Sequence, residues 1–311
     1  MNNDINIASR ATLFNNMDDM HNYFNSKIKD IWEFYSSYSS TNKIHQSFVN
    51  GTVLASLYSA LEILLNDTSI RFLISYPGHI SSKIANKFDI VTENDSVSTI
   101  IRHYAEHIIN ELSYKDLKTY LENIYNFFGE KLTLEADKLG LLIEGKASRD
   151  IFIHNNSVIN DVYLNRAGSY ARYKQTGKEL EIDFTYLTEI KNCIEILSND
   201  FKTHCLDKYR NDNKENIFKK MWEMSSLNRI VPFGNVWDLT DGHLSFNGDF
   251  HYLFSSSENA LYRFFRYIFH GEDPEPEHSI SSNCIAYALQ CWRGTINERI
   301  IFSWLEYPFY L

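Results

Sequence analysis

The feature that most constrains this chain is its shortage of residues that interrupt helices. It has 5 Pro and 12 Gly in 311 residues, so long stretches pass without a residue that favours a turn. An all-β fold of this length would need many more turn residues. Apolar residues make up 44% of the chain, which is enough for a sizeable core. The sequence therefore predicts a mainly helical protein with short connections.

Apolar residues recur at three- and four-residue steps through most of the first 200 residues, which is typical of amphipathic helices. One such stripe runs through about 11–38. A wider one runs through about 44–65, where Asn66-Asp67-Thr68 is expected to break or bend the helix. Further helices are expected at about 96–112, 114–128, 134–159 and 180–199. Together they predict an up-and-down helical bundle.

The last hundred residues are less regular. The polar stretch 207–215 predicts a boundary, with a helical bundle over 1–205 and a C-terminal subdomain over 206–311. Glycines and short aromatic alternations at 236–254 favour a small β-hairpin. Helices are expected at 259–269 and 280–292, and the acidic stretch 271–277 is expected to be a loop. The apolar end at 300–311 is expected to dock on the core or on another subunit.

Charge and cysteine usage narrow the class of protein. The net charge is −10, so binding to RNA or DNA would need a local basic patch. Four scattered cysteines form no C-x-x-C pair, which argues against a zinc ribbon and for reduced thiols. The N-terminus lacks the pattern of a signal peptide, and no run of about 18 apolar residues occurs. We expect a cytoplasmic protein with no membrane partner.

One segment combines the residue types that cleavage of a phosphodiester requires. It is Arg149-Asp150-Ile-Phe-Ile-His154-Asn155-Asn156, and it lies in the predicted helix 134–159. Arg149 can hold and neutralise a phosphate, and His154 can take or give a proton at neutral pH. Asp150 stands four residues before His154, where it can hold the imidazole. Asn155 and Asn156 add amide donors and acceptors as supporting groups.

The spacing of Arg149 and His154 discriminates little by itself. On a helix the two lie about 140° apart, so they border one surface without stacking on each other. Arg102 and His107 have the same four-residue gap. An interhelical salt bridge for the arginine and a satisfied histidine are the structural alternative.

The longer string at 148–164 is more specific, and it resembles the signature of the HEPN superfamily. That signature is an arginine, a polar residue, a few mostly apolar residues and a histidine. In one group of these proteins an asparagine, a small-apolar stretch and a tyrosine follow the histidine. The order of the predicted helices is similar over about 11–173, and the C-terminal third has no counterpart.

The resemblance implies a metal-independent endoribonuclease that is a homodimer and needs no cofactor. In such proteins the arginine and histidine of both subunits meet in a cleft at the two-fold axis. The ribose 2′-OH attacks the adjacent phosphate and leaves a cyclic phosphate and a free 5′-OH. Carried over to this chain, Arg149 binds the phosphate, His154 is the acid–base group and Asp150 is the polar helper. A role as a toxin or antiphage (abortive infection) effector is also implied, with a cognate antitoxin or regulatory protein as a further partner.

Another HEPN function stays open. HEPN toxins paired with nucleotidyltransferase antitoxins often carry a modifiable tyrosine three positions after the histidine, and here that position is Ser157. Some HEPN domains are non-catalytic modules. The second hypothesis is therefore a HEPN module that binds a partner protein or a nucleotide, with the aromatic C-terminal third as its docking surface.

A basic stretch without acidic residues follows the motif at 162–178. Exposed cations and rings of this kind hold phosphates and stack bases. The alternative is an ordinary basic connection between helices. The candidate RNA-binding residues are Arg166, Arg172, Lys174, Lys178, Tyr170 and Tyr173.

A second motif predicts different chemistry. His103-Tyr-Ala-Glu106-His107 matches the H-x-x-E-H form of inverted zinc peptidases, with both histidines on one helical face. A third ligand would have to come from elsewhere. A zinc hydrolase is the remote alternative, and a solvated or partner-facing helix is the simpler interpretation.

Overall fold

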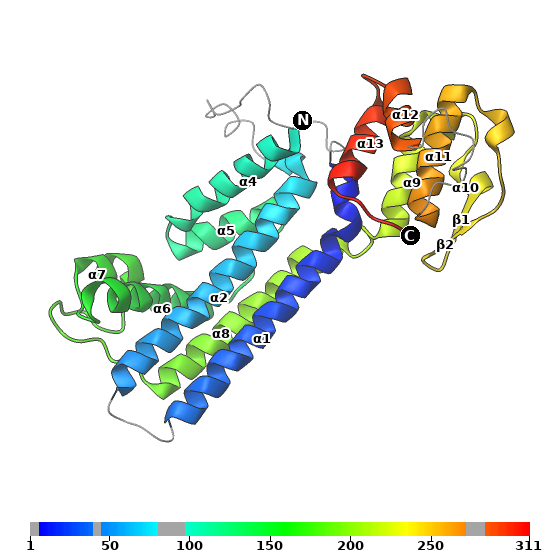
Figure 1. The fold of residues 1–311 in the computed structure, drawn as a ribbon. Helices are drawn as coiled ribbons and strands as arrows, with labels where there is room; N and C mark the ends of the chain where they lie inside the picture. The colour runs from blue at the N-terminus through cyan, green and yellow to red at the C-terminus, as the bar shows by residue number, and fades with distance from the viewer. Residues whose placement is uncertain (1–5, 40–44, 80–96, 272–283) are drawn as a thin grey trace. The chain divides into compact units, whose positions relative to one another are not determined.

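The computed structural model describes residues 6–39, 45–79, 97–271 and 284–311 (Figure 1). This part of the chain is mainly helical, which confirms the predicted class. It divides into two compact units. The bundle unit is Met17–Leu73 with His79–Lys208, and the C-terminal unit is Met1–Asn16, Ile74–Gly78 and Tyr209–Leu311. The acidic stretch 271–277 falls almost wholly outside the described residues.

The bundle unit contains the longest helices. Tyr35 of α1 joins the neighbouring helices, because its hydroxyl donates to Asn50 on α2 at 2.9 Å and its ring stacks on Phe184 of α8 at 5.7 Å. Figure 1 shows α1, α2 and α8 side by side. The helices are α1 (Leu13–Ser39), α2 (Gln46–Ser75), α4 (Val97–Ser113), α5 (Leu117–Phe127), α6 (Ala136–Asn155), α7 (Asp161–Ala167) and α8 (Phe184–Phe201).

Helix α1 follows the predicted stripe. Met17, Phe24, Ile28 and Tyr35 are each no more than 2% exposed, and their spacing of four or seven residues puts them on one face. Full burial of each such side chain contributes about 1.5–3 kcal/mol to folding. The apolar periodicity alone therefore predicts both this helix and the face that it buries.

The expected break in α2 at 66–68 is wrong, because α2 continues to Ser75. Two of the three polar residues there are held within the bundle: the Tyr120 hydroxyl donates to Asn66 Oδ1 at 2.7 Å, and Thr68 is fully buried. Asp67 is exposed, so it does not interrupt the helix. By length and composition α2 is apolar enough to cross a membrane, but 61% of its most apolar window is buried inside the protein, as in a core helix.

Two helical glycines allow helix α6 to pack closely. A Cβ atom on Gly145 would collide with the Tyr58 hydroxyl of α2 and with Ile190 of α8. A Cβ atom on Gly51 of α2 would collide with the ring of Phe152 on α6. These glycines therefore bring the helix that carries the candidate site against its neighbours, at some cost in helix propensity.

Helix α6 ends earlier than the predicted 134–159. Asn156 and Ser157 adopt left-handed conformations with φ of 50° and 63°, and both of their backbone N–H groups donate to Ile151 O. The chain then pairs with a later stretch, since Ile159 N donates to Lys178 O at 2.8 Å. Residues 156–182, which we name the α7 segment, contain the separate short helix α7.

The C-terminal unit packs around aromatic rings. Trp237 meets Phe218 edge-on at 5.0 Å, and Trp222 meets Phe265 at 5.1 Å. The expected hairpin is present, with Trp237 opposite Phe246 and a turn at Asp241-Gly242, where both φ angles are positive. The elements are η1 (Ile7–Thr12), α9 (Lys214–Met224), α10 (Phe233–Val236), β1 (Trp237–Thr240), β2 (His243–Phe246), α11 (Ser256–His270), α12 (Cys284–Cys291) and α13 (Ile296–Glu306).

The start of the chain belongs to this second unit. Ile7 and Ala8 are each 1% exposed within its core, and Ala8 N donates to Ser303 Oγ at 2.9 Å. The predicted division into 1–205 and 206–311 therefore differs from the observed one in two ways. The units meet in sequence at Lys208 and Tyr209, and residues 1–16 and 74–78 join the C-terminal unit.

Candidate functional site

The predicted catalytic residues line one pocket of about 620 Å³ in the bundle unit. Arg149, Asp150 and His154 contribute to it from α6, and Arg166 contributes from α7. The pocket also contains side chains that the sequence did not single out. These are Glu62 and Asn66 of α2, Ser113 to Leu117 at the α4–α5 connection, Tyr120 of α5, and Ile143, Lys146 and Ala147 of α6.

Helix geometry explains why α6 supplies so much of the wall. Lys146, Asp150 and His154 follow one another at four-residue steps, so they lie along one face of the helix. Arg149 stands beside Asp150 and borders the same pocket. The predicted shared surface for Arg149 and His154 is therefore present.

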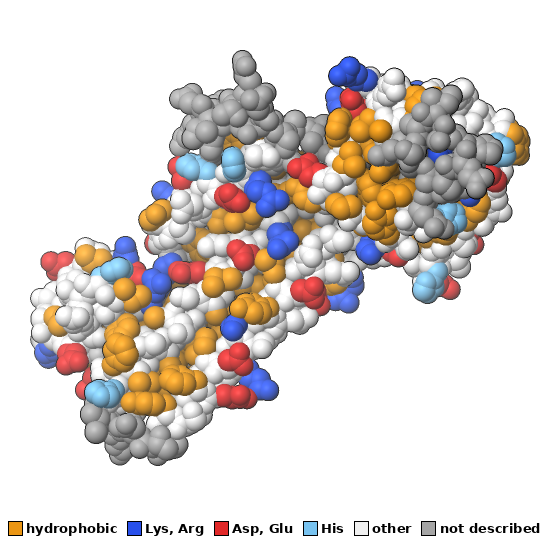
Figure 2. All heavy atoms as spheres, in the orientation of Figure 1, with side chains coloured by type: hydrophobic (Ala, Val, Ile, Leu, Met, Phe, Trp, Pro, Cys, Tyr) orange, Lys and Arg blue, Asp and Glu red, His pale blue; other side chains and the backbone are white. Residues whose placement is uncertain are grey.

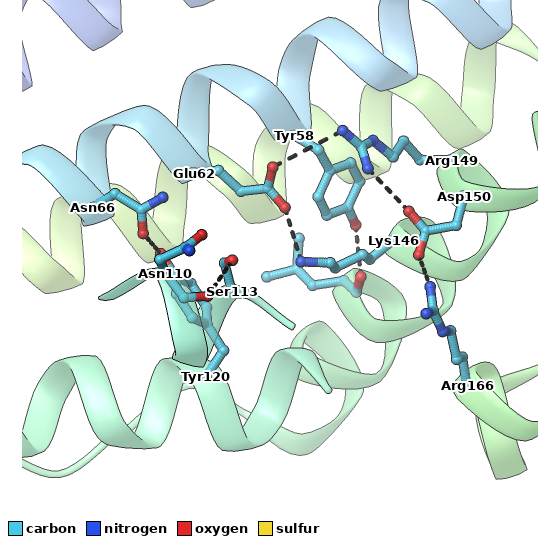
Figure 3. Close-up of polar contacts among 11 residues, drawn as sticks. Tyr58, Glu62, Asn66, Asn110, Ser113, Tyr120, Lys146, Arg149, Asp150 and Arg166 are labelled. Atoms are coloured by element: carbon cyan, nitrogen blue, oxygen red, sulfur yellow. Dashed lines mark hydrogen bonds and ion pairs between the residues drawn. The ribbon is translucent and has the colours of Figure 1, made fainter. Parts of the chain in front are cut away.

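Charges of opposite sign alternate across the pocket (Figure 3). Lys146 Nζ donates to Glu62 Oε1 at 2.8 Å, and Arg149 Nη2 lies 4.0 Å from Glu62 Oε2. Arg149 Nη1 donates to Asp150 Oδ1 at 3.0 Å, and Arg166 donates to the other oxygen of Asp150. Three cations face two carboxylates, so this charge chain carries one excess positive charge.

Asp150 positions the arginines. Its side chain is 11% exposed and bridges Arg149 with Arg166. The predicted bond from Asp150 to His154 is absent from the described hydrogen bonds. A carboxylate that bonds two guanidinium groups keeps both directed into one pocket, because charge-assisted hydrogen bonds restrict the orientation of a planar guanidinium group.

His154 is exposed in the last turn of α6. The two asparagines that follow it act on the end of the helix. Asn155 Nδ2 donates to Val158 O at 2.5 Å, and Asn156 is the left-handed C-cap. Neither lines the pocket, so their predicted support for the site is limited to holding this helix end.

A buried carboxylate anchors the α7 segment to α6. Glu144 is 1% exposed and accepts hydrogen bonds from Tyr163 (2.7 Å), Tyr186 (2.6 Å) and Ser148 (2.6 Å), while Arg172 Nε lies 3.1 Å away. Burial, reinforced by the charge of Glu144, raises the pKa of Tyr163 and of Tyr186. Both phenols therefore stay protonated and serve as donors.

This anchor also positions Arg166. Tyr163 and Arg166 lie about one turn apart on α7, and their partners Glu144 and Asp150 lie on α6. Two separate charged contacts thus join the helices, one buried and one at the pocket. The network around Glu144 therefore determines where Arg166 meets the pocket.

The predicted RNA-binding residues do not form one surface. Arg172 points inward: its Nη1 donates to Glu181 O at 3.0 Å, and its guanidinium lies 3.6 Å from the centre of the Tyr186 ring. Burial lowers the pKa of Arg172, but the neighbouring Tyr186 and Glu144 outweigh this effect and raise it. Arg172 is thus occupied by internal contacts.

The other residues of that group are spread around the α7 segment. Lys174 and Lys178 are exposed, the ring of Tyr170 covers Gly140, and Tyr173 lies beneath Arg172 at 5.6 Å. None of these four lines the pocket. Figure 2 shows basic and acidic side chains interspersed over the visible face of the bundle unit.

The residues of the H-x-x-E-H motif have no third ligand nearby among the side chains that the structure describes. His103, Glu106 and His107 are exposed on α4, and His107 Nε2 lies 3.3 Å from Glu111. Within the described ranges no three His, Cys, Asp or Glu side chains gather as a metal site would require. The arrangement there fits a solvated helix face.

Two signals in the sequence point to the residues that were missed. Glu62 is the first charged side chain of α2, after sixteen uncharged residues, and Lys146 lies one helical turn before Asp150.

Comparison with protein-family models, curated proteins and solved structures returns no match, so a functional proposal rests on the pocket and on the sequence resemblance.

Proposed function

We propose that this chain is a metal-independent endoribonuclease of the HEPN type. The observation that carries the proposal is that Arg149, Asp150, His154 and Arg166 line one pocket. Guanidinium groups are suited to a phosphodiester, and an exposed imidazole beside them is suited to proton transfer at neutral pH.

The chemistry assigns a role to each group. Arg149 and Arg166 hold the scissile phosphate and offset the charge that develops on it. As the ribose 2′ oxygen bonds to phosphorus and the bond from phosphorus to the 5′ oxygen breaks, His154 of one copy takes the 2′-OH proton and His154 of the second copy gives a proton to the leaving 5′ oxygen. The products are a cyclic phosphate and a free 5′-OH. Asp150 does not react and keeps the two arginines in place.

A homodimer with a composite site is part of the proposal. Exposed apolar side chains occur beside His154 in sequence and on the next helix: Ile153 of α6 is 45% exposed and Val162 of α7 is 51% exposed. Such a surface is suited to burial against a second copy. The cytoplasmic location, the role as a toxin or antiphage effector and the antitoxin or regulatory partner rest on the resemblance alone.

The test compares two histidine variants of the purified protein. His154→Ala should lower the rate of RNA cleavage by at least about a hundredfold, because it removes the acid–base group. The fold should persist, since His154 is exposed. His103→Ala, on exposed α4, is the matched control and should cleave at the wild-type rate. Undiminished cleavage by folded His154→Ala would contradict the proposal, and loss in His103→Ala alone would favour the zinc hydrolase.

The second candidate is a non-catalytic HEPN module that binds a nucleotide or a partner protein. It is favoured over catalysis by the pairing of Lys146, Arg149 and Arg166 with Glu62 and Asp150, which leaves these cations less able to stabilise the charge that develops on a scissile phosphate. Expression in a host cell separates the two candidates. A ribonuclease should harm the cell in a manner that His154→Ala abolishes, whereas a binding module should not.

A further inference from the structure

The pocket extends beyond its charge chain. On the side of Glu62 away from Arg166, it is lined by Asn66, Ser113 and Tyr120 (Figure 3). The α4–α5 connection completes this end with Tyr114, Lys115 and Asp116. Asp116 is already used as the N-cap of α5, where its Oδ1 accepts from Thr119 N at 2.9 Å. This end is polar, but its labelled side chains in Figure 3 are uncharged.

Tyr114 supplies an open aromatic ring at this end. Its side chain is 82% exposed, the highest value among the large hydrophobic side chains that the structure describes. A ring left in water contributes nothing to the core, whereas a ring beside a pocket can stack on the flat face of a ligand. Nucleobases are the flat ligands that accompany phosphates, and they stack on tyrosine irrespective of sequence.

Asn66 supplies an oriented hydrogen-bond donor. The Tyr120 hydroxyl donates to Asn66 Oδ1 at 2.7 Å, which fixes the amide. Burial and the charge of Glu62 raise the pKa of Tyr120, so the phenol stays a donor. Asn66 Nδ2 then has no partner within the described part of the chain. An amide nitrogen in this position suits a carbonyl or ring-nitrogen acceptor on the edge of a base.

We propose that the Asn66–Tyr114 end of the pocket binds a nucleobase, with Tyr114 as the stacking ring and Asn66 as the donor to the base edge. The phosphate of the same nucleotide lies toward Arg149 and Arg166. A pocket of about 620 Å³ falls within the range of small-molecule sites and is large enough for one nucleotide. The inference deepens the proposed function and rests on it for the identity of the ligand as single-stranded RNA.

The experiment measures equilibrium binding by calorimetry, without cleavage. The ligands are inorganic phosphate, ribose 5-phosphate, uridine 5′-monophosphate and adenosine 5′-monophosphate. A base site predicts that the nucleotides bind at least about tenfold more tightly than ribose 5-phosphate, which has the sugar and phosphate but no base.

Variants of Tyr114 then test whether its ring provides the gain in affinity of the nucleotides over ribose 5-phosphate. Tyr114→Ala should remove most of it and leave the affinity for inorganic phosphate unchanged, whereas Tyr114→Phe should keep it because the ring remains. Tyr23→Ala, at a 58% exposed tyrosine of α1, is the matched control. Because Tyr114 is so exposed, its variants are expected to fold.

Failure of this inference is separable from failure of the proposed function. Equal affinity for nucleotides and ribose 5-phosphate, or equal losses in Tyr114→Ala and Tyr23→Ala, would overturn the base site, even if RNA is cleaved through His154. A nucleotide preference that depends on Tyr114, in a protein that cleaves no RNA, would support the base site and overturn the ribonuclease.

Discussion

Glu62 is paired with cationic side chains that would otherwise bind a phosphate. It accepts a hydrogen bond from Lys146 and lies beside Arg149 at the centre of the pocket. An incoming phosphate must compete with this carboxylate or displace it. The internal ion pairs thus offset the positive charge of the pocket, at the expense of its affinity for an anion.

Replacing Glu62 by Gln should therefore tighten the binding of inorganic phosphate. The amide keeps a hydrogen-bond acceptor for Lys146 but removes the competing charge, and we expect a gain of about fivefold for these part-exposed groups. Asp67→Asn, at an exposed position of the same helix, should leave the affinity unchanged. Weaker phosphate binding in Glu62→Gln would show that Glu62 helps to hold the anion.

The sequence identifies some site residues better than others. Arg149 and His154 could be predicted because their chemistry and helix position are both visible in the chain. The role of Arg172 could not, since a basic residue in a polar stretch gives no sign that a buried glutamate will turn it inward. Asn155 and Asn156 were expected to support the site, but they terminate a helix.

At the scale of elements, the contact between α6 and α7 depends on Glu144. Tyr163→Phe removes one hydrogen bond to this buried carboxylate and should destabilise the bundle unit by about 1.5–3 kcal/mol. Unfolding in urea followed by circular dichroism measures this. Tyr170→Phe, at a 43% exposed tyrosine in the same segment, is the control and should change stability little. Equal effects of the two variants would contradict the anchoring role.

Helices were predicted well where one face is apolar and poorly where polar residues point inward. The stripe of α1 is complete in the sequence, and α1 was found where expected. Asn66 and Thr68 suggest a break because polar residues favour turns, but Asn66 has its partner Tyr120 far along the chain and Thr68 is buried. The end of α6 depends on two left-handed residues that are not glycine, which periodicity does not predict.

At the scale of the whole molecule, the second unit is assembled from distant parts of the chain. Ile7 is buried in its core, together with residues more than two hundred positions later. Ile7→Asp should destabilise this unit by more than about 2 kcal/mol, because it buries an unpaired charge. Asn15→Asp, at an exposed position of α1, is the matched control.

Tryptophan fluorescence measures the unfolding of the C-terminal unit and so tests this prediction. Trp222, Trp237, Trp292 and Trp304 all belong to the C-terminal unit, whereas Trp32 is in the bundle unit. Unfolding of Ile7→Asp should shift the fluorescence transition to a lower urea concentration. An unchanged transition would mean that the start of the chain is dispensable for the core. Composition alone could not reveal this assembly, since Ile7 belongs to a short segment without a periodic stripe.

We propose that this pocket cleaves RNA without a metal ion, and the ends of the RNA products test this most directly. A defined synthetic RNA is incubated with the purified full chain with and without EDTA, and the fragments are analysed by mass spectrometry. We predict fragments with 2′,3′-cyclic phosphate and 5′-OH ends, formed by the wild-type protein and not by His154→Ala. The absence of cleavage by the wild-type protein, or 5′-phosphate ends that disappear in EDTA, would contradict the claim.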